Sequence, residues 1–422
     1  MPVRAGFAEI DITPPIGTRK IGWIKEIIST EVADPLFARA AVFESGGDRA
    51  AFVQLDTCLV SATQTADIRQ RVEKAHGFPG QAIMVSATHN HAGPAVEGGV
   101  DFPRDDAYVE TLTTKVVQAF GEALARMQDA EIGASSVFEW RISHNRRVVM
   151  RDGTVKTHGT FADPNSLYIE GPIDPEVGVL AARGSDGQLL GLLVNFSCHP
   201  THHGGDTVLS GGYPGVLARE MKSRGCPVTL FFNGAAGNLH TSDPAAGGAD
   251  MGMEAAGMVL AEDASAALAK MSFSDDIRVT SVSRLISLPY RSATDAEIRG
   301  TAKGAQRFID PAIYDRGMAG LVEMIRKQGV QPAEVQAISV GPYTYAGVPA
   351  EYFVQHGLRI KEESHPRHAL VISCTNGMVG YVPHKDAFRR GGYETTFSSG
   401  SKLAPEAGDM LADAAVALIR GL

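Results

Sequence analysis

Five short apolar runs in this sequence each end at a turn of polar, glycine or histidine residues. The clearest is Ile83 to Ala87, which leads into Thr88-His89-Asn90-His91-Ala92-Gly93-Pro94. Short apolar runs bounded by Gly and Pro are typical of buried strands. Because sites in α/β sheets gather beyond the strand ends, the pattern predicts a sheet protein whose chemistry lies in these turns.

The other four runs repeat this arrangement. They are Leu192 to Phe196, leading to Cys198-His199-Pro200-Thr201-His202-His203; Val228 to Phe232, leading to His240; Tyr343 to Gly347, leading to Val348-Pro349-Ala350-Glu351; and Leu370 to Ser373, leading to Gly380-Tyr381. Convergence of such strand ends would bring imidazoles, a carboxylate and a phenol together. These are ligand types of a catalytic divalent metal.

Helical and strand patterns alternate along the whole chain. Strands are expected near 50–56, 81–87, 189–197, 227–232, 277–288, 333–346 and 368–373, and helices near 63–76, 106–128, 214–224, 251–270, 293–308, 311–328 and 406–420. Some strands follow one another without a helix, so we expect an α/β fold with mixed β-sheets flanked by helices. The polar segment 141–176 is expected to form a long functional loop.

Length and composition exclude several classes of protein. The 422 residues carry a net charge of -9 and no basic run, which argues against a nucleic-acid partner and favours a small-molecule substrate. No apolar stretch reaches the roughly 18 residues of a membrane span, and the N-terminus lacks a signal core, so we expect a cytoplasmic protein. Four cysteines without C-x-x-C spacing are expected to be buried apolar residues. The oligomeric state does not follow from the sequence.

The residues alone leave several roles open. His89 and His91 could bind one metal together, or one could bind while the other acts as acid or base, or both could be satisfied by backbone hydrogen bonds. His199 is the expected ligand of its turn because it ends the apolar run, whereas His202 and His203 are expected around the pocket or in solvent.

Four further side chains could have either a role in the site or an ordinary structural role. A carboxylate such as Glu351 at the start of a helix-like run can simply stabilise the helix dipole. Aromatic residues beside glycine, such as Tyr381 and Tyr393, usually pack. Arg146 could hold an anionic or carbonyl group of a substrate, but a surface arginine is the usual case.

The motifs together resemble the neutral/alkaline non-lysosomal ceramidase family. The resemblance rests on Gly6 to Pro15, Ala87 to Pro94, Cys198-His199-Pro200-Thr201, Val348-Pro349-Ala350-Glu351 and the stretch from Gly380-Tyr381-Val382 to Gly392-Tyr393-Glu394. These motifs occur in the family's order over residues 6 to 394. The resemblance implies one large catalytic domain over residues 1–422, without the C-terminal β-sandwich domain of secreted members.

The resemblance also implies a zinc site and its assisting groups. One ion per chain would be held by His89, His199, Glu351 and Tyr381, and the site would be assisted by His91, Arg146 and Tyr393. The sequence does not separate zinc from manganese or iron.

The chain departs from the family at one turn. Ceramidases carry a serine in a Gly-Asp-x-Ser-Pro turn, whereas this chain reads Gly237-Asn238-Leu239-His240-Thr241, with His240 in the serine's place. We therefore expect a divergent bacterial-type member: a zinc-dependent hydrolase that cleaves an amide, lactam or ester bond, through a metal-activated water, in a substrate smaller and more polar than ceramide.

The resemblance assigns the expected steps to particular residues. His91 would move the proton, with His240 as a second candidate, and Arg146 and Tyr393 would stabilise the oxyanion. One alternative is a lactonase or esterase for a sugar-derived or other small polar substrate. An alternative of another class is a metal-binding or regulatory protein without catalysis.

Overall fold

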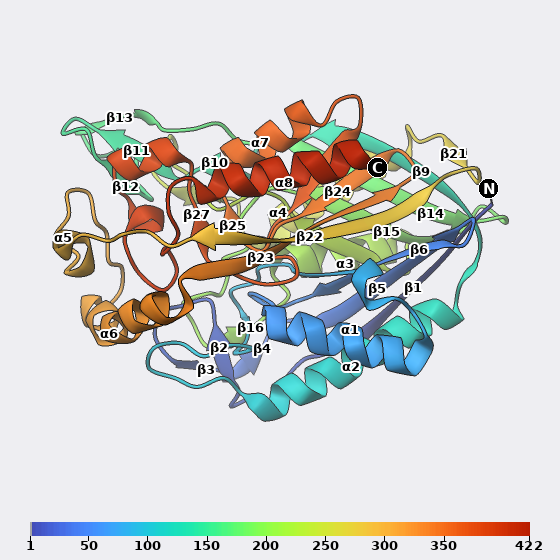
Figure 1. Cartoon of the computed structure of the whole chain (residues 1–422). Helices are drawn as coiled ribbons and strands as arrows, with labels where there is room; N and C mark the ends of the chain where they lie inside the picture. The colour runs from blue at the N-terminus through green and yellow to red at the C-terminus, as the bar shows by residue number, and fades with distance from the viewer. Residues whose placement is uncertain (1) are drawn as a thin grey trace.

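Two β-sheets lie face to face between layers of helices in the computed structural model, which describes residues 2–422 (Figure 1). Within these residues the larger sheet has nine strands, in the order β17-β15-β14-β9-β1-β5-β6-β7 with β21 paired to β9. They are β1 (Val3–Asp11), β5 (Phe37–Ser45), β6 (Asp48–Leu55), β7 (Ile83–Ala87), β9 (Gln128–Phe138), β14 (Glu176–Gly184), β15 (Leu189–Phe196), β17 (Thr229–Asn233) and β21 (Phe273–Ser274).

The second sheet has the order β22-β23-β24-β26, from β22 (Val279–Pro289), β23 (Val330–Val340), β24 (Tyr343–Gly347) and β26 (His368–Ile372). Most neighbours in both sheets are antiparallel, but β6 with β7, β15 with β17 and β24 with β26 are parallel pairs. The mixed α/β fold that the sequence predicts is therefore confirmed.

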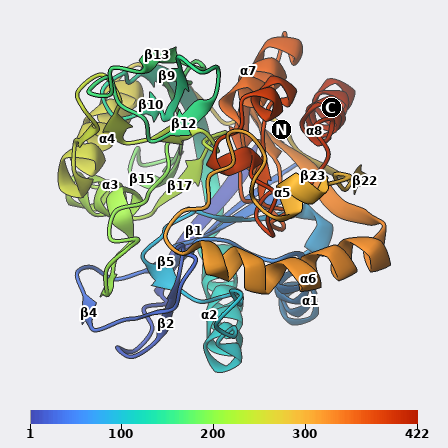
Figure 2. The same ribbon diagram turned by 90° about the vertical axis from the view of Figure 1, so that its left-hand side faces the viewer.

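Helices surround the sheets (Figures 1 and 2). The helices are α1 (Ala62–His76), α2 (Asp106–Ala125), α3 (Gly212–Ser223), α4 (Met253–Leu268), α5 (Asp295–Ile298), α6 (Pro311–Gln328), α7 (Val354–Glu363) and α8 (Ala407–Gly421). The pairs α1 with α2 and α3 with α4 pack on the larger sheet, whereas α7 and α8 pack on the four-stranded sheet. Burial of apolar surface between these layers is the main stabilising term.

Aromatic side chains fill the space between the two sheets. Phe52 of β6 packs against Phe43, Phe232 and Tyr345, with ring centroids 6.2, 5.5 and 5.1 Å away. Strand side chains alternate between faces, so each central strand contributes one set of residues to this core and another to a helix layer. This double burial explains why the strands read as continuous apolar runs.

Short elements gather at one end of the sheets. They are β2 (Arg19–Ile21), β3 (Ile27–Ile28), β4 (Glu31–Val32), β8 (Gly93–Pro94), β10 (His144–Asn145), β11 (Arg147–Met150), β12 (Val155–Thr157), β13 (Ser166–Ile169), β16 (Val208–Leu209), β18 (Leu239–His240), β19 (Ser242–Asp243), β20 (Ala249–Asp250), β25 (Glu351–Tyr352), β27 (Tyr381–Val382) and the 3-10 turns η2 (Lys385–Arg389) and η3 (Tyr393–Thr395). A further 3-10 turn, η1 (Gly80–Ala82), directly precedes β7, at the other end of that strand from His89. The turns that follow the five apolar runs of the sequence lie at this end of the sheets (Figure 1).

Three predicted elements are wrong in detail. Residues 293–308 are helical only over Asp295–Ile298, because Gly300 and Gly304 adopt φ values of 68° and 78° that end a right-handed helix. The strand predicted at 333–346 is a hairpin whose turn begins at Gly341, with φ 56°.

The segment 141–176 is also more ordered than a plain loop. It carries β10 and the three-stranded sheet β12-β11-β13, in which Val148 and Val149 are buried. Among residues 2–422, no helix combines the length and the apolar character that a membrane crossing requires.

Candidate metal centre and pocket

His89 leaves β7 in a conformation that a histidine seldom adopts. Its φ is 66°, in the left-handed region that costs a residue with a side chain of order 1 kcal/mol or more. The side chain of Asn90 fixes the turn by accepting from the backbone N–H of Ala92 at 2.9 Å and donating to the carbonyl of Ser210. The turn thereby directs the His89 ring inward, where it is 3% exposed.

Side-chain atoms of His89, His199 and Glu351 meet in one cluster. Nε2 of His89 lies 3.1 Å from Nε2 of His199 and 3.2 Å from Oε2 of Glu351, and the same carboxylate oxygen lies 3.1 Å from Nε2 of His199. His199 follows β15, and Glu351 lies in β25 beyond β24. Three strand ends distant in sequence therefore supply one cluster, as the run-and-turn pattern predicts.

Hydrogen bonds on the far side of each ring decide which nitrogen faces the cluster. Nδ1 of His89 is 2.8 Å from the carbonyl of Cys58, and Nδ1 of His199 is 2.7 Å from the carbonyl of Ala236. A carbonyl only accepts, so both Nδ1 atoms carry protons, and each ring in its neutral form turns an Nε2 lone pair inward. Two lone pairs and a carboxylate at such distances attract a cation, and the donor set fits a divalent metal.

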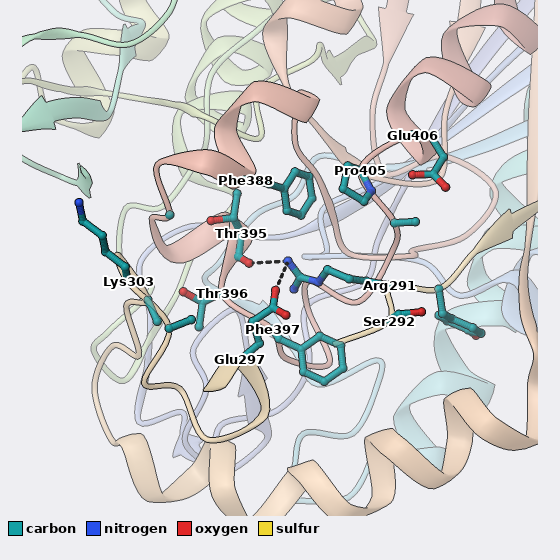
Figure 3. A pocket seen from close by; sticks show the side chains of 15 residues that line it. Arg291, Ser292, Glu297, Lys303, Phe388, Thr395, Thr396, Phe397, Pro405 and Glu406 are labelled. Carbon is teal, nitrogen blue, oxygen red and sulfur yellow. Dashed lines mark hydrogen bonds and ion pairs between the residues drawn. The ribbon is translucent and has the colours of Figure 1, made fainter. Parts of the chain in front are cut away.

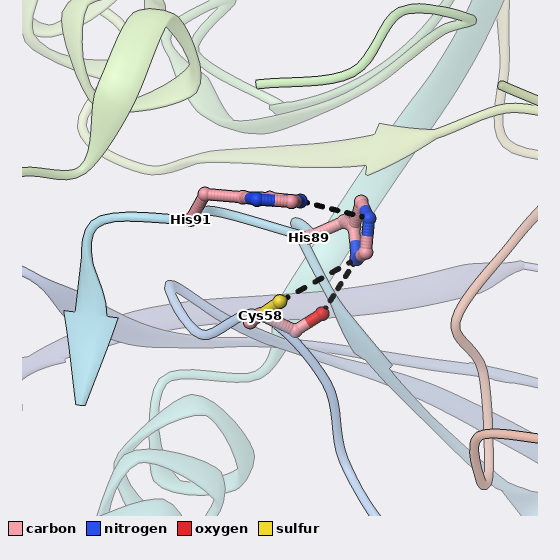
Figure 4. Close-up of side chains that lie close together, drawn as sticks. All are labelled: Cys58, His89 and His91. Carbon is pink, nitrogen blue, oxygen red and sulfur yellow. Dashed lines mark hydrogen bonds between the residues drawn. The ribbon is translucent and has the colours of Figure 1, made fainter. Parts of the chain in front are cut away.

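His91 and Cys58 occupy opposite sides of the His89 ring (Figure 4). Nε2 of His91 lies 3.2 Å from Nε2 of His89, on the side of the acceptor cluster. The Cys58 sulfur lies 3.9 Å from Nδ1 of His89, the nitrogen whose proton goes to the Cys58 carbonyl. Although Cys58, His89 and His91 also form a close group, the cysteine therefore faces away from the atoms that could share an ion.

The electrostatics separate the roles of the imidazoles. Burial, with a contribution from Arg146, lowers the pKa of His199 to about 4. Burial and the neighbouring His89 and His199 lower the pKa of His91 well below its usual range. Burial alone would raise the pKa of Glu351, but the two imidazoles hold it well below its usual range. Burial alone would lower the pKa of His89, but Cys374, Cys58 and Glu351 raise it well above its usual range. Without a metal the cluster thus presents a carboxylate with a protonated His89 and with neutral His91 and His199 at pH 7.

Tyr381 reaches the cluster through strand pairing. β25 and β27 are parallel, and Glu351 and Tyr381 are direct partners in the pairing. The Tyr381 ring stacks on His199 with a centroid separation of 6.4 Å and lies edge-on to Tyr393 at 5.5 Å. Burial and the Glu351 carboxylate raise the pKa of its hydroxyl well above the usual range, so the phenol keeps its proton.

Arg146 is a buried residue, contrary to the surface position that is usual for an arginine. It is 3% exposed; its Nε donates to Oε1 of Glu394 at 2.8 Å, and its Nη2 donates to the carbonyl of Gly237 at 2.9 Å. Nη2 also lies 3.3 Å from the hydroxyl of Tyr381. The guanidinium is thus held rigidly at the edge of the cluster.

Glu394 pairs with Arg146 beside the cluster, a contact that the sequence analysis did not predict. Its side chain is fully buried between Arg146 and Arg147, and Nη1 of Arg147 donates to its Oε2 at 2.7 Å. Two guanidinium groups outweigh its burial and lower its pKa to about 2. The sequence does contain an acidic residue directly after Tyr393 and two adjacent arginines, Arg146 and Arg147. Only the fold shows that these two segments meet.

A cavity of about 730 Å³ opens onto the cluster. Its polar wall contains His91, Arg146, His158, Thr201, His202, His203, Asp206, His240, Asp250, Tyr381 and Tyr393. Its apolar wall contains Trp23, Ile24, Phe308 and Ile309, and a smaller apolar hollow of about 200 Å³ towards α6 shares Trp23, Ile24 and Tyr393. His202 and His203 lie around the pocket and pair with Asp250 and Asp206.

A separate cavity of about 440 Å³ surrounds Arg291 (Figure 3). Arg291 packs between Phe388 and Phe397 and donates to the carbonyls of Thr395 and Ser401 at 2.9 and 3.0 Å. Its terminal nitrogens thus donate hydrogen bonds to backbone carbonyls, so this arginine holds the segment that follows Tyr393 in place.

Comparisons with known proteins agree with the motifs. No family model matches the chain. A neutral ceramidase from Oryza sativa subsp. japonica is 25% identical over 235 residues, which make up 52% of this chain and 29% of the rice protein. The chain thus matches less than a third of that relative's length.

Solved structures extend the likeness to the whole fold. The neutral ceramidase of Pseudomonas aeruginosa superposes with a TM-score of 0.75 at 19% identity, and a ceramidase complexed with C2 with a TM-score of 0.76 at 18% identity. Each match covers 100% of this chain and 75% of the solved chain. The resemblance to the neutral ceramidase family that the sequence motifs indicate is thus confirmed, in sequence over half of the chain and in fold over all of it.

Proposed function

We propose that this protein is a metal-dependent hydrolase that cleaves an amide, lactam or ester bond in a small molecule. The observation that carries the proposal is the meeting of two imidazole Nε2 atoms and one carboxylate oxygen within about 3 Å, with both Nδ1 atoms hydrogen-bonded to backbone carbonyls. His89, His199 and Glu351 would hold one divalent ion, zinc by the family resemblance, and Tyr381 would complete the set.

When bound, such an ion lowers the pKa of a water molecule to about 7 and polarises a carbonyl group. His91 would accept the proton at Nε2, because this nitrogen lies beside the ligand cluster, 3.2 Å from Nε2 of His89. A proton held there can then be delivered to the leaving group. This assigns proton transfer to His91 and binding to His89 and His199.

Arg146 and Tyr393 stabilise the oxyanion in this proposal. The bonds of Arg146 to Glu394, Gly237 and Tyr381 use part of its five N–H groups, and Arg146 also lines the cavity. Burial keeps Tyr393 protonated by raising the pKa of its hydroxyl far above neutrality. Both residues line the cavity, where each would supply a hydrogen-bond donor to the oxyanion.

Our proposal of a substrate more polar than ceramide is supported by the part of the cavity wall beside the cluster, although apolar atoms make up most of the cavity's exposed lining. Imidazole, hydroxyl and carboxylate groups line the wall beside the cluster, and His240 fills the turn where ceramidases have a serine. The apolar hollow towards α6 leaves room for a short apolar substituent. A lactonase or esterase acting on a sugar-derived or similar substrate is the second candidate, favoured by this polar wall.

The test combines metal content with turnover. Purified protein should contain about one divalent ion per chain and hydrolyse at least one member of a panel of small amides, lactones and esters, with negligible cleavage of long-chain ceramide. His240→Ser should lower activity on the best small substrate. A metal-loaded protein that turns over nothing in the panel would favour the non-catalytic, metal-binding alternative, and efficient ceramide cleavage would refute the polar-substrate assignment.

A further inference from the structure

The His240 ring has a defined proton position. The backbone N–H of Ser242 donates to Nδ1 of His240 at 3.0 Å, so Nδ1 presents a lone pair. A neutral imidazole then carries its proton on Nε2, which lies 2.7 Å from the hydroxyl oxygen of Thr201. Burial, assisted by His158 and Arg146, keeps the ring neutral by lowering its pKa well below the usual range.

This arrangement determines what the Thr201 hydroxyl can do. Its oxygen accepts the proton of His240 Nε2, so its own proton is directed elsewhere. Thr201 lines the cavity next to the cluster, two residues beyond His199, and its carbonyl accepts from the N–H of Gly204 at 2.9 Å. The ring of His158 stands perpendicular to that of His240 at 4.7 Å and limits its rotation.

We propose that the Thr201 hydroxyl donates a hydrogen bond to an oxygen atom of the substrate, and that His240 acts through Thr201 as a positioning residue. The inference rests on the proposed function and sharpens its substrate class. The substrate carries an acceptor oxygen, such as a hydroxyl, carbonyl or ring ether, close to the scissile bond. His240 is excluded as the proton shuttle, because both of its nitrogens are already engaged.

Conservative variants test the substrate contact. Thr201→Val keeps the side-chain volume and removes the hydroxyl, and should lower kcat/KM on the best small substrate about 10- to 100-fold. Thr201→Ser should retain activity within about 3-fold, since it keeps the donor. Metal content and Tm should match those of the wild type. Thr111→Val, in helix α2, is the matched control, and wild-type kcat/KM in Thr201→Val would overturn the proposal.

A double-mutant cycle tests the positioning role. His240→Ser should cost activity in the wild type but little more in the Thr201→Val background, because His240 acts through the hydroxyl that Val lacks. Additive losses would show that His240 acts independently of Thr201. The conservative Thr201→Ser rescue distinguishes this role from a loss of packing.

Imidazole ¹⁵N NMR gives a readout that needs no substrate. The His240 signal, assigned by its loss in His240→Ser, should show a neutral ring protonated on Nε2, and the Nε2 proton should shift in Thr201→Val. A ring protonated on Nδ1 would overturn the proposal even if no substrate in the panel were turned over. Absence of turnover by the metal-loaded wild type would instead count against the proposed function.

Discussion

Glu351 and Tyr381 are direct partners in the parallel pairing of β25 with β27, although they follow different strands of the four-stranded sheet. The pairing fixes a carboxylate and a phenol on one side of the cluster that His89 and His199 complete. The phenol keeps its proton, because burial and Glu351 raise its pKa well above the usual range. Glu351 is therefore the stronger ligand of the pair in our proposal.

The first prediction concerns metal binding. His89→Ala and His199→Ala should each lose most of the bound divalent ion, since each removes one of the converging donors. Tyr381→Phe should lose less, because a protonated phenol contributes little charge. Elemental analysis of purified variants measures the occupancy, with His76→Ala at the end of helix α1 as the control. Full occupancy in both histidine variants would eliminate this site.

The second prediction separates binding from catalysis. His91→Ala should keep the metal and the fold but reduce kcat roughly 100- to 10,000-fold, the usual loss for a group that transfers a proton. Steady-state kinetics on the best small substrate, with metal content measured on the same sample, checks this outcome. An unchanged rate at full metal content would make His91 a bystander.

The third prediction concerns the oxyanion. Tyr393→Phe removes one hydroxyl and leaves the ring to pack against Tyr381 and Phe308. Loss of one oxyanion donor costs about 3 kcal/mol in the transition state, so kcat should fall about 100-fold while KM changes little. Tyr168→Phe, an exposed tyrosine of β13, is the control. A rise in KM at unchanged kcat would assign Tyr393 to ground-state binding instead.

The fourth prediction links stability to pH. The Glu394 pKa of about 2 lies below the ordinary value of 4.5, so its ionised form stabilises the fold above about pH 4.5, and this contribution disappears as the pH falls towards 2. Glu394→Gln should lower the free energy of unfolding by about 3 kcal/mol at pH 7, and the gap to the wild type should narrow below pH 4.5.

Urea unfolding of both proteins at pH 7, 5, 4 and 3 measures this gap. Glu323→Gln is the control, because Glu323 pairs with Arg326 on an exposed face of α6, where an ion pair contributes little. A gap that stays constant over this pH range would show that Glu394 stabilises the fold by packing rather than by charge.

Several strands and their turns were predictable because local sequence determines them, although the sequence reading did not identify β1, β5, β9 and β14. The run 83–87 is apolar over a strand's length and stops at polar residues, so both β7 and the position of His89 follow from the pattern. The predicted helix 293–308 failed because two glycines with positive φ override its periodicity. Short strands such as β10 form only when a partner, here β18, lies beside them.

Long-range contacts explain what the sequence could not reveal. The burial of Arg146 depends on its ion pair with Glu394, a residue 248 positions away, and no local sequence pattern predicts that pair. The proton position of His240 likewise depends on the backbone N–H of Ser242, which is a matter of turn geometry rather than residue type. The motifs identified residues that meet in the cluster, whereas the hydrogen bonds that orient each group required the fold.

The measurement that tests the central claim most directly is anomalous diffraction from crystals of the purified protein, recorded above and below the zinc edge. We predict one strong difference peak between Nε2 of His89, Nε2 of His199 and Oε2 of Glu351. An equivalent peak at the edge of manganese or iron would change the metal and keep the site. Fully ordered side chains with no anomalous peak among them, or a peak elsewhere in the molecule, would contradict the account.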